Sequence, residues 1–228
     1  LAPLAREHEL IITHGNGPQV GVLALESAND PALSHPYPLD TLGAETQGLI
    51  GYWLVQEFQN HLPDRMIAAL VTQTVVDADD PAFGQPTKFV GAVYDEAELR
   101  PIAEERGWAI APDGDRWRRV VASPDPIRIV ETPVIRLLLD GGALVVCAGG
   151  GGVPVLEGPD DALSGVEAVI DKDLTTALLA EQLNADVFLV LTDVDGVQRD
   201  FGTPQAERIA TATADELRSA SFAAGSMG

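Results

Sequence analysis

The chain has 228 residues and a formal net charge of −21, from 35 acidic and 14 basic residues. Apart from Arg116, Arg118 and Arg119 the basic residues are scattered, which excludes the basic face that a nucleic-acid-binding protein needs. No apolar run could span a bilayer, no signal peptide is visible, and the single cysteine, Cys147, forms no internal disulfide, so we expect a cytoplasmic protein.

The first third of the chain predicts two strands and two helices. Residues 9–13 are a short apolar run that enters a tight loop, which is typical of a buried strand. Pro18 favours the first turn of a helix over 18–27, and apolar residues at helical spacing predict a long helix over 39–61. Residues 66–76 are rich in Val, Ile and Thr and predict a further strand.

Residues 77–125 break this pattern, because they are rich in Asp, Pro, Gly and Trp. Their one periodic segment is a short helix near 96–106. We interpret 77–125 as a subdomain or lid inserted into a single domain that spans 1–228. Trp108 and Trp117 would supply the small core of the insertion.

The second half returns to alternating strands and helices. Residues 127–140 predict a strand or turn and then a helix, and 143–148 predict a buried strand. A helix is expected over 171–183 and a buried strand over 187–191. A capping box, Thr213 with Glu216, predicts a last helix.

Alternating strands and helices indicate a mostly parallel α/β sheet with helices on both faces. In such sheets ligands bind beyond the carboxyl ends of the strands. Three unusual loops, 15–17, 149–152 and 192–193, fall at these ends. Their convergence at one edge predicts the binding site.

The two glycine loops are predicted to bind phosphate. Glycine allows backbone N–H groups to gather around an anion, and the helix after Gly17 adds its dipole. The alternative is that both loops are structural turns. Neither loop has the spacing of a P-loop or of a dinucleotide-binding fingerprint.

Asp171, Lys172 and Asp173 lie where a helix is predicted to begin. Asp171 suits the N-cap position, but a lysine in the first turn opposes the helix dipole. A bound phosphate would offset that repulsion, and the two carboxylates would orient the ammonium. The alternative is a solvated surface lysine.

For the other candidate residues, a structural role is an alternative to a functional one. Thr192 and Asp193 could bind a ribose or phosphate, although Asp195-Gly196 is a common turn pair. Cys147 is expected to be a buried small hydrophobic residue, and His14 either a satisfied core histidine or a group that orients the first glycine loop. The histidines have no ligand spacing, so no zinc site is expected.

Several motifs follow one another in chain order: THGNGPQVG at 13–21, TQG at 46–48, GYW at 51–53, WRRVVASP at 117–124, CAGGGGVP at 147–154, IDKD at 170–173, LTDVDGV at 191–197 and GSMG at 225–228. Taken together, these motifs resemble those of the carbamate kinases in the amino acid kinase superfamily. The insertion at 77–125 resembles the protruding subdomain of these enzymes.

The resemblance implies a three-layer open α/β sandwich, a homodimer, and the reaction ATP + carbamate ⇌ ADP + carbamoyl phosphate, run toward ATP in arginine breakdown. Mg²⁺ would be held through the nucleotide phosphates, without a protein metal site. The residues that the resemblance assigns are Lys172, Asp171 and Asp173 for catalysis; Gly15, Asn16, Gly17, Gln19, Gly149, Gly150 and Gly151 for substrate and phosphate; and Thr192, Asp193, Val197 and Met227 for the nucleotide.

Three departures from the family pattern leave alternatives open. The family's opening strand with its Gly-Gly-Asn loop, and a lysine after the Gly-Ser-Met turn, fall outside the chain, which we expect to be incomplete at both ends. In the insertion, Ala111 or its neighbours take the place of a family lysine. The alternatives are a related kinase that acts on acetylglutamate or glutamate, and a non-catalytic protein that binds nucleotide or carbamoyl phosphate.

Overall fold

The computed structural model describes residues 1–192 and 194–220, and the chain divides into two compact units, Leu1–Asp186 and Val187–Gly228. The helices of the first unit are α1 (Ala2–Glu7), α2 (Gly17–Asn29), α3 (Leu39–His61), α4 (Glu96–Arg106), α5 (Thr132–Asp140) and α6 (Lys172–Leu183), with 3₁₀ turns η1 (Pro81–Phe83), η2 (Gly149–Gly151) and η3 (Pro159–Asp161). None of the helices in the described residues is long and apolar enough to cross a membrane.

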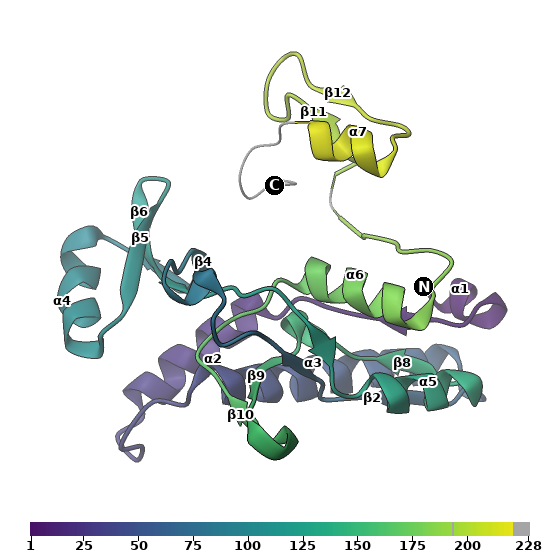
Figure 1. Ribbon diagram of the computed structural model, residues 1–228, viewed down its shortest axis with the longest axis horizontal. Coiled ribbons are helices and arrows are strands. Elements are labelled where there is room, and N and C mark those ends of the chain that lie inside the picture. The colour runs from purple at the N-terminus through teal and green to yellow at the C-terminus, as the bar shows by residue number, and fades with distance from the viewer. Residues whose placement is uncertain (193, 221–228) are drawn as a thin grey trace. The chain divides into compact units, whose positions relative to one another are not determined.

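The strands of the first unit form three sheets (Figure 1). The first has the order β1-β8-β2 (Ile11–Ile12, Leu144–Val146, Ile67–Ala69) and is parallel throughout. The second has the order β10-β9-β3-β7 (Leu163–Gly165, Val153–Glu157, Gln73–Val75, Arg128–Ile129), and its β3 and β9 are parallel. The third has the order β4-β6-β5 (Lys88–Tyr94, Arg116–Val121, Ala109–Asp113) and is antiparallel.

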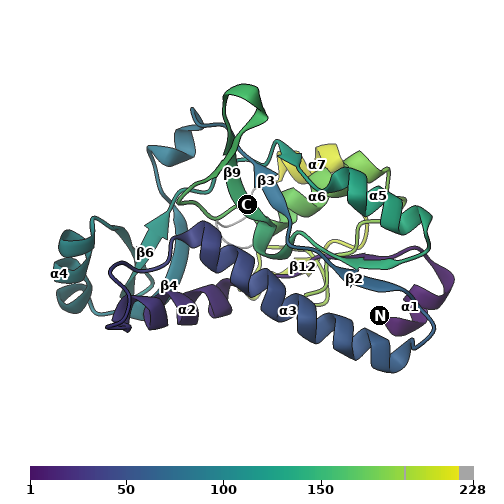
Figure 2. The same ribbon diagram turned by 90° about the horizontal axis from the view of Figure 1, so that it is seen from below.

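Both faces of strand β8 pack against hydrophobic side chains of the core. Leu144 and Val146 pack with side chains of α1 and α3, whereas Val145 packs with side chains of α5 and α6. All three are buried, because successive side chains of a strand point to opposite faces. Figures 1 and 2 show α3 along one face of this sheet, with α5 and α6 across the other. The predicted layered α/β architecture is therefore confirmed.

The predicted strand over 66–76 is two strands. After Ala69 the chain leaves its partner β8, and from Gln73 it pairs with β9 in the second sheet. A run rich in Val, Ile and Thr gives no sign of this change, because the change depends on which strand lies alongside.

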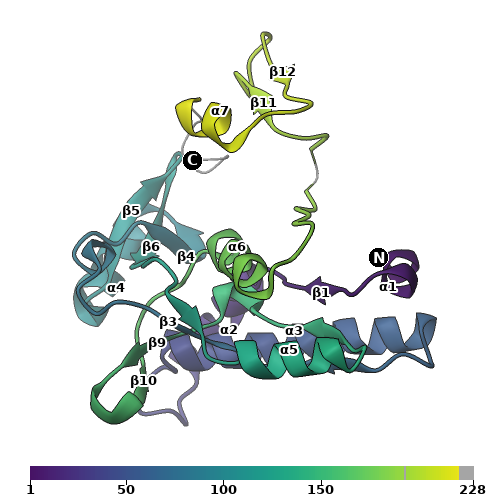
Figure 3. The ribbon, with the colours of Figure 1, turned by 45° about the vertical axis from the view of Figure 1, so that its right-hand side comes forward.

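The insertion contains more regular structure than its sequence indicates. Helix α4 has the predicted bounds, is capped by Asp95 with Glu98 in a capping box, and ends at Gly107. Strands β4, β5 and β6 were not predicted. In β4, a bulge between Val90 and Val93 interrupts the alternation. The sheet and α4 lie together in Figures 1 and 3. Three arginines of this region lie over its tryptophans: Arg100 over Trp117, and Arg106 and Arg119 over Trp108, the last at 4.6 Å.

The second unit contains β11 (Gln198–Arg199) paired with β12 (Glu207–Arg208), and α7 (Ala214–Ser219). The predicted capping box is present, since Thr213 accepts from the amide of Glu216. The predicted buried strand over 187–191 is wrong. In the described part of the chain these residues pair with no strand, and Val187 is 77% exposed. An apolar run becomes a buried strand only where neighbours bond to its backbone.

Candidate active site

Two glycine turns meet at the carboxyl end of the parallel sheet. The chain passes from β1 into the turn 14–17 and from the neighbouring β8 into the turn 148–152. The amide of Gly150 donates to the carbonyl of His14 at 2.7 Å. A Cβ at Gly150 would overlap the Asn16 side chain, and one at Gly149 would overlap the His14 ring. The predicted meeting of these two loops is confirmed. The third loop of that prediction, 192–193, belongs to the other unit, and its place at this edge stays a prediction.

The second turn uses its own amides to hold its shape. Besides the bond from Gly150 to His14, the amide of Gly151 donates to the carbonyl of Ala148 and the amide of Gly152 to that of Gly149. From the sequence we expected these N–H groups to be directed together at an anion. The structure contradicts this expectation for the second turn, because the three N–H groups bond to carbonyls of the protein. Glycine is required here for another reason, because Gly150, Gly151 and Gly152 all have positive φ.

The backbone N–H groups of the first turn are more available to a ligand than those of the second. Helix α2 begins at Gly17, and its N-cap residue, Asn16, makes no side-chain capping bond. Instead the Asn16 amide group donates to Thr46 Oγ1 at 2.9 Å. The first-turn amides of α2 therefore have no intrahelical or capping partner, and such amides together with the helix dipole favour an anion.

Lys172 lies beside the first turn. A Cβ built on Gly15 would be 3.5 Å from Lys172 Cδ, so the lysine stem passes directly along that glycine. The Lys172 ammonium donates to Asp173 Oδ2 at 2.9 Å, and the lysine side chain is 48% exposed. The structure thus places the predicted lysine beside the first glycine turn.

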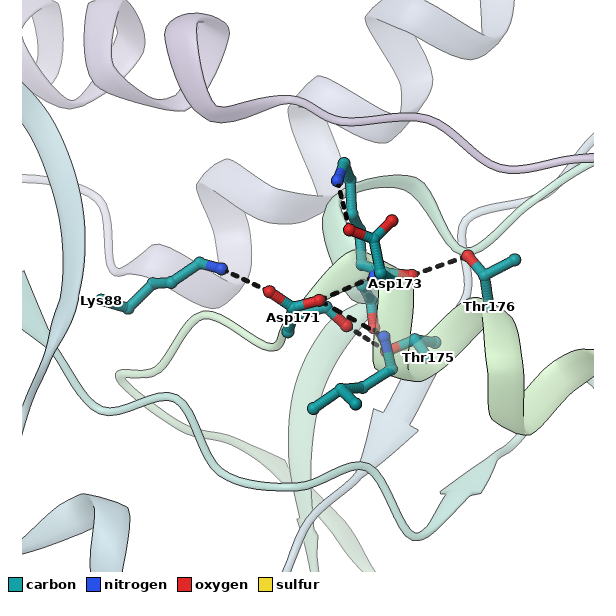
Figure 4. A network of polar contacts seen from close by, with 8 residues as sticks. Lys88, Asp171, Asp173, Thr175 and Thr176 are labelled. Atoms are coloured by element: carbon teal, nitrogen blue, oxygen red, sulfur yellow. Dashed lines mark hydrogen bonds and ion pairs between the residues drawn. The ribbon is translucent and has the colours of Figure 1, made fainter. Parts of the chain in front are cut away.

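Asp171 has a different partner from the one expected. Its Oδ1 accepts from the amides of Asp173 at 2.8 Å and Leu174 at 3.3 Å, which confirms the predicted N-cap of α6. Its Oδ2 accepts from Lys88 Nζ at 2.7 Å (Figure 4). Asp173 therefore orients Lys172, while Asp171 orients Lys88.

Lys88 is the site residue that the sequence analysis missed. It lies on β4 of the insertion, whereas Ala111 lies on β5 opposite Arg118. The expectation that the insertion lacks a lysine near the site, with Ala111 in its place, is therefore wrong. A signal was present, since Lys88 and Lys172 are the chain's two lysines among 14 basic residues, and the structure brings both to one acidic helix start.

The contacts of Asp171 change its acidity. Burial alone would raise the pKa of its carboxyl, but the hydrogen bond and charge of Lys88 and the two backbone amides together lower that pKa below its usual value. A carboxyl with a lowered folded-state pKa stabilises the fold above its unfolded pKa, about 4, and this contribution is lost as the pH falls through the folded value.

We therefore expect Asp171→Asn to lower the melting temperature at pH 7 and the deficit to shrink as the pH falls below about 4. Asparagine can still accept the capping bonds, but it has no charge for Lys88. Thermal unfolding from pH 8 to pH 3 measures this, with exposed Asp140→Asn at the end of α5 as the control. A deficit that stays the same across this pH range would contradict the assignment.

His14 and Cys147 adjoin the turns but differ in burial. The His14 ring is partly buried beside Gly149, and this burial lowers its pKa, partly offset by the bond between Nδ1 and the Gly15 carbonyl. Cys147 is buried, as predicted, and burial followed by the charge of Glu131 raises its pKa to about 12. A thiol of that pKa is no nucleophile at neutral pH.

The predicted nucleotide residues belong to the other unit. Thr192 and Val197 lie in Val187–Gly228, while Asp193 and Met227 lie outside the described residues. Their assignment to the nucleotide stays a prediction.

The whole chain is similar to known proteins. The model of the amino acid kinase family matches residues 1–228. The chain is 51% identical to carbamate kinase of Rhizobium meliloti and 50% identical to carbamate kinase of Escherichia coli K12, covering all of this chain and 71% and 75% of those proteins. Carbamate kinase from Giardia lamblia bound to AMP-PNP superimposes with a TM-score of 0.79 at 38% identity, over 91% of this chain and 70% of that one.

Proposed function

Since this chain belongs to the amino acid kinase family, we propose that its site transfers a phosphoryl group between ATP and carbamate, ATP + carbamate ⇌ ADP + carbamoyl phosphate. The observation that carries this proposal is the pair of ammonium groups held at the start of α6, Lys172 beside Gly15 and Lys88 on Asp171, in a chain about half identical to carbamate kinases along its whole length. The relatives give no support to acetylglutamate or glutamate as the substrate.

The chemistry needs charge neutralisation more than acid–base catalysis. A carbamate oxygen is already anionic, so it attacks the γ-phosphorus without a general base while the bond to the ADP oxygen breaks. Such a transfer depends on positioning and on stabilising charge on the phosphoryl oxygens. The transfer therefore requires neither His14, whose pKa is lowered, as a general base nor Cys147, whose pKa is raised, as a nucleophile.

Each charged group has a role in this proposal. Lys172 neutralises the transferred phosphoryl group, and the amides at Gly17 and Gln19 bind its oxygens at the start of α2. Lys88 approaches from the insertion toward the same group, so the insertion acts as a subdomain that completes the site. In the turn 148–152, Gly149, Gly150 and Gly151 form the wall on the carbamate side.

Mg²⁺ would be held mainly by phosphate oxygens. Asp171 and Asp173 are each paired with a lysine, so neither carboxylate is left to form a protein cage. Magnesium bound in this way would neutralise charge on the β- and γ-phosphates. The assignment of Thr192, Asp193, Val197 and Met227 to the nucleotide follows from the family resemblance and is part of the same proposal.

The remaining features follow from the family resemblance and are proposed with it. The protein is a cytoplasmic homodimer that makes ATP during arginine breakdown. Sedimentation of the purified protein measures the oligomeric state directly, and a monomer at micromolar concentration would contradict the dimer.

The proposed activity is tested by ATP formation from ADP and carbamoyl phosphate with magnesium, using the protein that contains this chain. We expect saturable ATP formation that depends on both substrates. Acetylglutamate and glutamate with ATP are the competing substrates. Turnover of either of these without turnover of carbamoyl phosphate would overturn the proposal, and binding of carbamoyl phosphate without turnover would indicate a non-catalytic protein.

A further inference from the structure

Buried polar side chains are concentrated around the two glycine turns. Thr46, Thr72 and Thr74 are completely buried. Within the described residues, the buried polar side chains that contact the turns or support them are Asn16, Thr46, Gln47, Thr72, Thr74 and Thr175. Ser27 is the other described one, and it bonds within its own helix. Burying such groups is unfavourable unless each is hydrogen-bonded.

One chain of bonds supports the entry to the second turn. The amide of Ala148 donates to Thr72 Oγ1 at 2.8 Å, and Thr72 Oγ1 donates to Gln47 Oε1 at 2.9 Å. Gln47 Oε1 also accepts from the amide of Thr72 at 3.0 Å, and Gln47 Nε2 donates to the carbonyl of Thr72 at 3.1 Å. Since a backbone N–H can only donate, the two N–H groups at Ala148 and Thr72 fix the direction of every bond in this chain.

Ala148 needs such support because of its backbone. It has a φ of 51°, in the left-handed region that residues with a Cβ disfavour by about 1–2 kcal/mol. A buried hydrogen bond to its amide helps to hold this conformation. The Thr72 hydroxyl therefore fixes the direction in which the chain leaves β8.

A second pair of bonds holds the exit of the turn. The carbonyl of Gly151 accepts from Thr74 Oγ1 at 2.9 Å and from Thr175 Oγ1 at 3.1 Å. Thr74 lies on β3 and Thr175 on α6, the helix that begins with Lys172. The Gly151 peptide is therefore fixed relative to the helix that carries the catalytic ammonium.

We propose that Thr72, supported by Gln47, is a positioning residue for phosphoryl transfer. The inference rests on the proposed function. Thr72 acts through the turn 148–152, whose Gly150 amide holds the carbonyl of His14 and so the first turn. Displacement of this turn would move the anion-binding amides relative to Lys172. Misplacement by about 1 Å can reduce a transfer rate by about a hundredfold.

The test compares Thr72→Val with Thr72→Ser. Valine keeps the shape of the threonine side chain and removes its hydroxyl, whereas serine keeps the hydroxyl. We expect Thr72→Val to lower kcat for ATP formation by about tenfold to a hundredfold, with KM for ADP changed by less than about threefold. Thr72→Ser should restore most of kcat. Thr132→Val is the control: it removes the hydroxyl bonds from the start of α5 to Ile129 and to Gln182 on α6, and it should keep the parent kcat.

Amide hydrogen exchange at Ala148 gives a readout independent of catalysis. We expect exchange about tenfold faster in Thr72→Val, and unchanged in Thr132→Val. Parent-like kcat and exchange in folded Thr72→Val would overturn the inference, as would a loss of kcat that Thr72→Ser does not restore. If Thr72→Val does not fold, Gln47→Met removes the acceptor of the hydroxyl at similar side-chain volume and is judged by the same two measurements.

The two proposals can fail separately. If the parent protein does not turn over carbamoyl phosphate, the proposed function fails. Exchange at Ala148 then still decides whether Thr72 holds the turn. If the parent is active and Thr72→Val matches it, the positioning role alone is rejected.

Discussion

Replacing Lys172 with alanine is expected to lower kcat for ATP formation by about a thousandfold, while the affinity for ADP changes by less than about threefold. The ammonium lies beside Gly15 and is oriented by Asp173, so it is positioned to meet charge on the transferred phosphoryl group. A group that binds more strongly to the transition state than to the ground state affects kcat most. Steady-state kinetics and calorimetric titration of ADP separate the two effects.

Lys172→Arg is the companion variant for this prediction. Arginine keeps the positive charge but presents a planar fork on a stem that passes Gly15, so we expect partial recovery of kcat. Equal losses in kcat and in nucleotide affinity for Lys172→Ala would show that the lysine only binds. Lys88→Ala leaves Lys172 in place, and its smaller expected loss provides an internal comparison.

Replacing Gly151 with alanine is expected to lower the free energy of unfolding by about 3 kcal/mol and kcat by about a hundredfold. Gly151 has a φ of 89°, and a Cβ there would lie 2.6 Å from the carbonyl oxygen of Ile170. That oxygen belongs to backbone, so it cannot rotate away as a side chain would. The turn or the start of α6 must move, and either movement displaces the turn relative to Lys172.

Gly142→Ala is a matched control, because Gly142 has a φ of 81° and a Cβ there meets nothing within 4 Å. Both substitutions carry similar backbone strain, about 1–2 kcal/mol, and only Gly151→Ala adds the collision. Chemical denaturation and steady-state kinetics of both variants measure the difference. Equal destabilisation with unchanged kcat in both would show that the turn tolerates a side chain.

Helix ends were predicted well because their signals are local. The bounds of α3 and α4 are those expected, and Asp171 and Thr213 cap the helices that they were predicted to begin. A cap needs only a side-chain oxygen and the amides two or three residues ahead. Four or five consecutive residues therefore contain all the information.

Strands were predicted less well because each depends on a neighbour distant in the sequence. The runs at 66–76 and 187–191 have similar apolar, β-branched composition. The first divides between two sheets, and the second pairs with no strand in the described residues. Composition indicates that a segment can form a strand, but the hydrogen bonds come from elsewhere in the chain.

The sequence by itself determined the layered α/β fold, the two glycine turns after parallel strands, and the capped helix that carries Lys172. Each of these follows from the order of nearby residues. Only the tertiary structure decided that Lys88 reaches Asp171 across 83 positions of the chain, that Thr72 bonds the Ala148 amide, and that Gly151 lies against Ile170. Such contacts depend on where distant backbone segments lie in space, and no local pattern of residues records them.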